Sequence, residues 1–439
     1  MLSLHYEGFG EEARKRGCIA ARCLVVATLC MAGSGCREAS EETGRSGVGV
    51  DSSTVWVTDS AGAEIVRISD LHALDLPELP RRLVYSTAAD LELYHVSGAV
   101  FLPDSSLAIA DRGSSQVILL DRHGSARERV GREGEGPGEY EDIEWIGVGA
   151  DGNLSVYDGG LGRFTFLEPS GRVTGVLRFD MTHAIAPLVH LAGGEFLAVL
   201  ETRPFRPLGF QRGPLFLVIG DQSGAVVDTL GRWAGKERFV TPGRMIRVGF
   251  AATALYAGRS SHAAVATTDS LDVTLYEGTE PLTRIRGGHS PREVTSREKE
   301  DWVELALDIY PEAMRPARRE VLAQSKVRDT YPAFGALKVD ADGGIWIGGY
   351  ARLEDVERRW TVFGPDGTPL GMLNLPVYRP ERLKIGQGTS TGWGVVELES
   401  TIPSAWHELL DVAGGLLAVL RTGKLGEEFI EVYEVEVPR

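Results

Sequence analysis

The sequence predicts an all-β protein: a six-bladed β-propeller of four-stranded antiparallel blades, with one helical insertion between blades four and five. Three observations lead to this prediction. Glycine supplies 54 of 439 residues, about 12% against an average of roughly 7%, which indicates many tight turns. A short unit of two strands recurs six times, and a second hairpin follows most copies.

The recurring unit is a short apolar strand, a tight turn rich in Asp and Gly, and a strand that alternates apolar and small or polar residues. This period of two is typical of strands with one buried face. The six copies are FLPDSSLAIAD (101–111), VGADGNLSVYD (148–158), LAGGEFLAVL (191–200), AGRSSHAAVATTD (257–269), VDADGGIWIGG (339–349) and DVAGGLLAVL (411–420).

A second hairpin completes the unit. In each case a hydrophobic strand ends in a glycine-containing turn, and a more polar strand follows, as expected for the outer edge of a sheet. Four strands per copy make one propeller blade. The four clearest examples are VILLDRHGSARERVG (117–131), FTFLEPSGRVTGVL (164–177), LFLVIGDQSGAVVDTL (215–230) and WTVFGPDGTPLGML (360–373).

These repeats resemble the bacterial six-bladed propellers of the NHL-like and TolB-like group, whose repeat reads approximately G-x-L-x-V-x-D and then V-x-x-F-D-x-x-G. Copies 101–131 and 148–177 carry the pattern best, and the segments 59–66 and 131–140 are also typical of that group. The resemblance covers about 370 residues and implies a fold, since its motifs do not specify chemistry. Some related propellers are lactonases or esterases that bind a divalent metal in the central channel.

A closed ring requires one blade to combine strands from both ends of the chain. The C-terminal FIEVYEVEV (429–437) reads as a third strand with nothing after it. Its partner is expected from RRLVYS (81–86) or AEIVRI (63–68), and we favour 81–86, because that segment precedes the first copy as ARERVG precedes the second.

The N-terminal part has the order of an export signal, so residues 1–36 are assigned to the signal, 37–60 to a flexible linker and 61–439 to the propeller. A basic cluster precedes the apolar run 23–33, which is too short to span a bilayer. All four cysteines lie in these 36 residues. Cys36 follows Gly-Ser-Gly, as in a lipobox, which favours a lipoprotein of the periplasm or outer membrane, lipidated at Cys36. The alternatives are a secreted protein and an N-terminus that is merely buried or whose start is misassigned.

The formal charge of −16 disfavours nucleic acid and anionic membrane surfaces as partners. We expect a monomer that contacts the membrane only through an N-terminal lipid anchor.

The longest connections are predicted on one face of the ring, which we call the loop face. In each blade the b–c and d–a connections emerge there, whereas the a–b and c–d hairpin turns emerge on the opposite turn face. The long connections are 131–143, 201–214, 231–247 and 287–333, and the last contains the helical insertion at about 291–330, where Pro311 and Pro316 predict two helices.

Loops held by a rigid scaffold are common binding surfaces, so the loop face is the candidate site. Residues expected to line it are Asp111, Arg112, Asp158, Arg163, Arg203 and Arg206.

No motif assigns a catalytic residue or a metal ligand. The glycine-rich 131–139 lacks a following helix and reads as a turn between blades. Ser390 in GTSTG lacks the setting of a nucleophile elbow, the nine histidines do not cluster, and Asp340-Ala-Asp-Gly reads as a hairpin turn rather than a calcium loop.

The leading hypothesis is therefore an exported, non-catalytic propeller without cofactor, which binds a protein, peptide or carbohydrate on its loop face. The alternative is a metal-dependent hydrolase of the lactonase or esterase type, with Ca²⁺ or another divalent metal in the central channel. A third hypothesis is a purely structural scaffold of the cell envelope.

Overall fold

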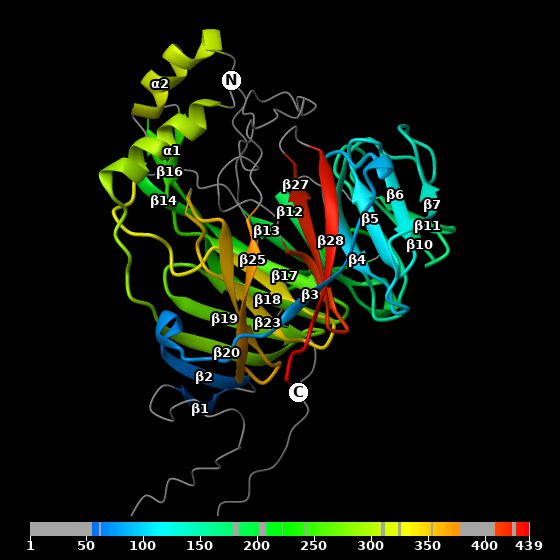
Figure 1. Ribbon diagram of the computed structural model, residues 1–439, viewed down its shortest axis with the longest axis horizontal. Coiled ribbons are helices and arrows are strands. Elements are labelled where there is room, and N and C mark those ends of the chain that lie inside the picture. The colour runs from blue at the N-terminus through cyan, green and yellow to red at the C-terminus, as the bar shows by residue number, and fades with distance from the viewer. Residues whose placement is uncertain are drawn as a thin grey trace, which may run out of the picture. The chain divides into compact units, whose positions relative to one another are not determined.

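A computed structural model of the chain describes residues 55–438 apart from 61–62, 179–183, 202–207, 222, 242–243, 309–311, 324–325, 353, 378–408 and 424–426 (Figure 1). The chain divides into two compact units, residues 1–46 and 47–439, and all described residues belong to the second. Cys36, Arg203, Arg206 and Ser390 lie outside the described residues. No described helix is long and apolar enough to cross a membrane.

The strands form six sheets, which correspond to six blades, I to VI. In chain order, blade I contains β4 (Val96–Phe101), β5 (Leu107–Asp111), β6 (Gln116–Leu120) and β7 (Ala126–Val130); blade II contains β8 (Ile143–Val148), β9 (Leu154–Asp158), β10 (Arg163–Leu167) and β11 (Val173–Arg178); blade III contains β12 (Ala184–His190), β13 (Phe196–Glu201), β14 (Gly209–Gly220), β15 (Val226–Thr241), β16 (Arg244–Gly249) and β21 (Lys326–Val327).

The second half of the ring is built in the same way. Blade IV contains β17 (Ala254–Arg259), β18 (His262–Thr267), β19 (Leu271–Glu277), β20 (Glu280–Gly288), β2 (Ala63–Asp70) and β1 (Val55–Ser60); blade V contains β22 (Ala336–Val339), β23 (Ile345–Gly348), β24 (Glu357–Phe363) and β25 (Pro369–Pro376); blade VI contains β26 (Leu409–Ala413), β27 (Leu416–Thr422), β28 (Glu428–Val435) and β3 (Arg81–Ser86).

The six innermost strands form a closed ring. In the order β4, β8, β12, β17, β22 and β26 each strand contacts the next, and β26 contacts β4. Blade I therefore lies opposite blade IV. The predicted fold class, a six-bladed propeller of four-stranded antiparallel blades with a helical insertion between blades IV and V, is confirmed.

The middle strands of each blade are apolar because the neighbouring blades cover both of their faces. β5 (LAIAD) and β9 (LSVYD) are buried along their whole length, whereas the outer strand β7 (ARERV) is almost entirely exposed. One hydrophobic cluster joins blades I and II, and another joins blades VI and I. Packing between blades, rather than a single central core, therefore stabilises the ring.

Strand β3 closes the ring, as the sequence analysis favoured. It pairs antiparallel with β28, so that Tyr85 lies opposite Val432, and in Figure 1 the blue β3 runs beside the red β28. Directly after β3, the buried Thr87 extends the pairing. Its amide donates to the Ile430 carbonyl at 2.9 Å, and its hydroxyl accepts from the Ile430 amide at 2.9 Å.

The alternative closing segment has a different role. Residues 63–68 belong to β2, which pairs in parallel with β20 at the outer edge of blade IV, and β1 pairs with β2. Sheet structure thus begins at Val55, within the segment 37–60 that the sequence analysis assigned to a linker. The N-terminal segment then follows blades IV, V and VI in turn, because the Leu79 amide donates to the Met372 carbonyl of β25 before β3 begins.

The elaboration of blade III is strand rather than loop. The segments 201–214 and 231–247 were expected to be connections, but β14 and β15 continue their antiparallel pairing as far as Gly209 opposite Val240, and β15 turns into β16. We call β14 from Gly209 to Pro214, β15 from Ala234 to Thr241, β16 and β21 the blade III extension. Frequent Gly, Arg and Lys residues hide its strand pattern.

The helical insertion forms two helices, α1 (Ser296–Asp308) and α2 (Arg315–Ala323), with the 3₁₀ turn η4 (Glu312–Met314) between them. In Figure 1 they lie beside β14 and β16. Trp302 of α1 is fully buried against Phe250, Val294 and Tyr331. Short 3₁₀ turns also occur in the N-terminal segment and blade III: η1 (Leu71–Ala73), η2 (Ala89–Leu91) and η3 (Ala192–Gly194).

Candidate functional site

Asp111 and Asp158 occupy the same place in blades I and II, at the end of the second strand. Both carboxylates are fully buried. Asp111 accepts from the Tyr94 amide at 3.0 Å and from the Ser114 hydroxyl at 2.5 Å. Burial raises the pKa of the Asp111 carboxyl, and these hydrogen bonds oppose the rise.

Asp158 repeats this arrangement one blade further on. It accepts from the amides of Glu141 at 2.8 Å, Asp142 at 3.2 Å and Leu161 at 2.9 Å. Both aspartates therefore join the b–c turn of their own blade to the chain that enters the innermost strand. Their oxygens satisfy backbone donors, which is a structural use of a buried carboxylate.

Arg163 is also buried and serves the connection between blades I and II. Its Nη1 donates to the Glu135 carbonyl at 2.6 Å, and its Nη2 donates to the carbonyls of Gly136 at 2.6 Å and Glu139 at 2.8 Å. The glycine-rich segment 131–139 is thus a turn between blades, as predicted, held in place by one guanidinium.

Arg112 is the most accessible of the described candidates. It forms an ion pair with Asp142, in which Nη2 donates to Oδ2 at 2.8 Å, and its side chain remains partly exposed. This pair joins blades I and II on the loop face. Whether Asp111, Arg112, Asp158 and Arg163 contact a ligand stays a prediction.

The blade III extension carries a group of cations and aromatic rings that the sequence analysis did not single out. The Arg328 guanidinium lies 4.1 Å from the centre of the Phe210 ring, and the Lys326 ammonium lies 5.3 Å from that of Phe239. The two rings meet edge to face at 5.1 Å. Phe210 nevertheless remains 40% exposed. We call these four side chains the cation–aromatic patch.

One ion pair holds the patch together, and another ties the blade III extension to blade IV. Arg328 forms a two-point ion pair with the buried Glu237, in which Nε donates to Oε2 at 2.8 Å, and this hydrogen bonding raises the pKa of the Arg328 guanidinium. Arg212 donates to Asp269 of blade IV at 2.5 Å and to the carbonyls of Gly235 and Ala234. The extension is therefore tied to blade IV.

A second group of charges occupies the centre of the ring. Arg259 of β17 in blade IV donates through Nη2 to the Phe101 carbonyl at 2.6 Å, and Phe101 belongs to blade I, on the opposite side. Asp411 of β26 accepts from the Phe101 amide at 2.7 Å and pairs with Arg259, with 3.3 Å between Oδ1 and Nε. Lys338 of β22 donates to the Leu410 carbonyl at 3.1 Å.

The charges in this central cluster do not balance, because Arg259 and Lys338 are two cations beside one carboxylate. Burial raises the pKa of the Asp411 carboxyl, with Arg259 opposing the rise, and lowers the pKa of the Lys338 ammonium, with Asp411 opposing the fall. Such surroundings favour an anion and disfavour a divalent cation. Among the described residues, no group of three or more His, Cys, Asp and Glu side chains could hold a metal ion.

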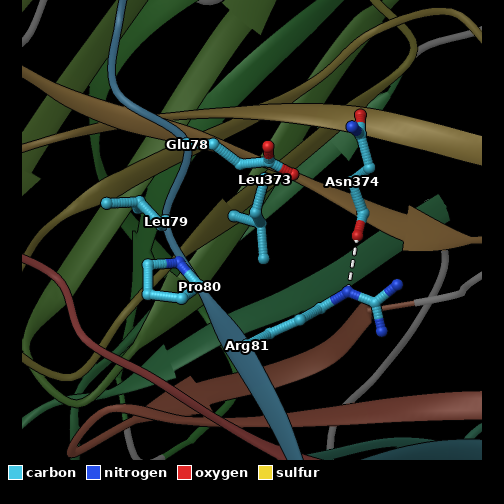
Figure 2. Close-up of a pocket in the computed structure, with 6 residues that line it drawn as sticks. All are labelled: Glu78, Leu79, Pro80, Arg81, Leu373 and Asn374. Carbon is cyan, nitrogen blue, oxygen red and sulfur yellow. Dashed lines mark hydrogen bonds between the residues drawn. The ribbon is translucent and has the colours of Figure 1, made fainter.

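An open hollow lies at the rim, between β3 and β25. It has a volume of about 490 Å³. Figure 2 shows Arg81 crossing it, with its Nε donating to the Asn374 carbonyl at 2.8 Å. The remaining lining residues are Glu78, Leu79, Pro80 and Leu373. Since Arg81 also lies over the Tyr433 ring, its guanidinium is used for packing between blades V and VI.

The remaining motifs have structural roles or lie outside the described residues. Asp340 accepts from the amides of Asp342 and Gly344 and from the Trp346 indole, which confirms the predicted hairpin turn. His190 stacks on Phe166 between blades II and III. His183 lies outside the described residues.

Comparisons with known proteins give no family for this chain: no family model and no curated protein matches it. Solved structures do match. A candidate exported protein from Bacteroides fragilis is 13% identical, with a TM-score of 0.44, over 85% of this chain and 100% of its own. A DUF4221 family member from Bacteroides vulgatus is 9% identical, with a TM-score of 0.46, over 83% and 100%.

A gluconolactonase from Xanthomonas campestris is 11% identical, with a TM-score of 0.37, over 89% of this chain and 96% of its own. Likeness at this level carries no argument about function. The propeller assignment therefore depends on the strand pairing and ring contacts of the chain itself.

Proposed function

We propose that this protein is an exported, non-catalytic propeller that binds an acidic segment of a protein partner on its loop face. The cation–aromatic patch is the observation that carries the proposal. An exposed ring stacked with a guanidinium offers apolar area and positive charge together, and Arg and aromatic residues are those that most often dominate binding energy in interfaces.

Local charge supports an acidic partner. Residues 203–247 contain eight Arg and Lys residues and three Asp and Glu residues, a formal charge of +5 in a chain whose total is −16. An acidic segment would be attracted to this region and repelled elsewhere, which orients binding and increases its rate. The predicted binding residues Arg203 and Arg206 belong to the same stretch of sequence.

A random peptide display library, selected on the purified protein, tests the proposal. We expect enriched peptides that combine Asp or Glu with apolar residues. Their affinity should fall about tenfold or more in Lys326→Glu and in Phe210→Ala, because each change removes half of a cation–aromatic contact or reverses its charge. Arg122→Glu is the matched control, since Arg122 is exposed in a turn-face hairpin.

Equal affinity of the enriched peptides for the wild type and for Lys326→Glu would overturn the assignment of this surface, provided that both proteins melt at the same temperature. Selection of peptides without acidic residues would overturn the proposed chemistry of the partner.

Export and lipidation at Cys36 are the second part of the proposal, supported by the basic cluster, the apolar run and the Gly-Ser-Gly-Cys order of the first 36 residues. Metabolic labelling with radioactive palmitate should mark the wild type and leave Cys36→Ala unlabelled. Label that persists in Cys36→Ala would overturn lipidation at this residue, and unlabelled protein in the medium would indicate plain secretion.

A further inference from the structure

The central cluster contains hydrogen-bond donors that the described residues leave unsatisfied. The Arg259 side chain is only 5% exposed, yet neither its Nε nor its Nη1 has a hydrogen-bond partner among those residues. Nε faces Asp411 Oδ1 at 3.3 Å without hydrogen-bond geometry, and among the described residues the guanidinium donates a hydrogen bond only from Nη2, to the Phe101 carbonyl. Buried donors of a charged group are almost always paired, because an unpaired one costs free energy.

Lys338 contributes further hydrogen-bond donors that lack partners among the described residues. An ammonium group has three donors, and the structure gives its Nζ one hydrogen bond, to the Leu410 carbonyl. Lys338 keeps some exposed surface as a residue, although its ammonium group is buried. One oxygen of Asp411 already accepts a hydrogen bond from the Phe101 amide, and this single carboxylate faces two cations, Arg259 and Lys338.

We propose that the centre of the ring holds a small inorganic monoanion, of the size of chloride, between Arg259 and Lys338. A water molecule could accept the same hydrogen bonds, but it would leave the excess positive charge unbalanced in a buried place. The occupant is small because Nε and Nη1 of Arg259 are enclosed by neighbouring atoms. A bound anion also stabilises the charged form of Lys338, which burial alone disfavours.

This site is separate from the proposed peptide surface. Arg259 ends β17 immediately before the turn to β18, and Phe101 ends β4 before the turn to β5, so the cluster lies toward the turn face. The anion would bridge the innermost strands of blades IV and V, and Arg259 and Asp411 already connect these to blades I and VI. Its expected role is to hold the ring together from the inside.

Thermal melting of the full protein in chloride and in gluconate, at equal ionic strength and pH, tests this inference. Gluconate is a monoanion too large for an enclosed site. We expect melting temperature to rise with chloride concentration until the site saturates, as for any ligand that binds only the folded state. Lys338→Met should raise the chloride concentration at half effect about tenfold or more, because one of two charged donors is lost.

Lys299→Met is the matched control, since Lys299 lies on helix α1 in a partly exposed ion pair with Asp329, and its loss should leave the chloride effect unchanged. Lys338→Met retains the Arg259 and Asp411 contacts, so it tests the site even if Arg259 variants fail to fold. The inference is overturned if chloride and gluconate act alike, or if Lys338→Met responds to chloride as the wild type does. Bromide diffusion into crystals should give an anomalous peak between Arg259 and Lys338, and a peak elsewhere would also overturn it.

Discussion

Arg259 and Asp411 hold the backbone of the same residue from two sides. Arg259 donates to the Phe101 carbonyl, Asp411 accepts from the Phe101 amide, and the two side chains form an ion pair at 3.3 Å. The three residues come from blades IV, VI and I. One buried pair therefore links non-adjacent blades through the centre of the ring, where packing between neighbouring blades does not reach.

Asp411→Asn tests the energetic weight of this link. The amide can still accept from Phe101, but it leaves Arg259 buried without an opposite charge, so we expect a loss of about 3–5 kcal/mol in the free energy of unfolding. Urea unfolding measures it. Glu434→Gln, which breaks an exposed pair with Arg82, should cost less than about 1 kcal/mol. If Asp411→Asn also costs less than about 1 kcal/mol, the proposed link between the blades is contradicted.

Lys338 makes stability depend on pH in a defined direction. Its folded pKa lies below the ordinary value of 10.5 because it is buried. Between the lowered pKa of the folded protein and the ordinary pKa of the unfolded chain, the unfolded chain binds a proton at Lys338 that the folded protein does not. The free energy of unfolding therefore rises as pH rises through this window. Lys338→Met removes the contribution.

The measurement is urea unfolding of both proteins in gluconate without chloride, because the proposed anion would hold Lys338 in its charged form, at rising pH that stays below about 10, where ordinary tyrosines titrate. Burial raises the pKa of Tyr85 and of Tyr140 to about 12, and these groups lower stability only at higher pH. The wild type should gain stability relative to Lys338→Met as pH rises. A difference between the two proteins that stays constant or shrinks would contradict the assignment.

Thr87 follows the strand that closes the ring and forms two hydrogen bonds with the backbone of Ile430. Its hydroxyl accepts from the buried Ile430 amide, so Thr87→Val keeps the shape of the side chain and leaves that amide without a partner. We expect a loss of about 1–3 kcal/mol in unfolding free energy. Thr174→Val is the matched control, because Thr174 is exposed on the outer strand β11 and should change stability by less than about 0.5 kcal/mol. Equal effects would show that ring closure does not depend on this contact.

The fold could be predicted from the sequence because its signals are local. Alternating residues and Asp-Gly turns identify each hairpin within about a dozen residues, and six copies reinforce one another. The blade III extension was missed because charged residues interrupt the apolar pattern that marks the other strands: the partly buried Arg212 and Arg238 and the buried Glu237.

The central cluster could not be predicted, because its members lie in different copies of the repeat. Arg259 and Phe101 are 158 residues apart in the sequence, and each charge alone reads as an ordinary polar residue at a strand end. One signal was present: Lys338 and Asp411 interrupt innermost strands that are otherwise apolar. Without the ring geometry, nothing indicates that they converge.

Arg163 distinguishes a structural from a ligand-binding role for the predicted loop-face residues. It is buried and donates to three carbonyls of the turn 135–139, so Arg163→Met should cost more than about 3 kcal/mol of unfolding free energy through the carbonyls left unsatisfied. Arg112→Gln, which removes one partner of a half-exposed pair, should cost less than about 1 kcal/mol. Urea unfolding and affinity for the selected peptides are measured on both variants. If Arg163→Met keeps its stability and loses affinity, Arg163 is a ligand-binding residue; if it loses stability and a folded population at low urea retains affinity, the guanidinium holds the turn between blades I and II.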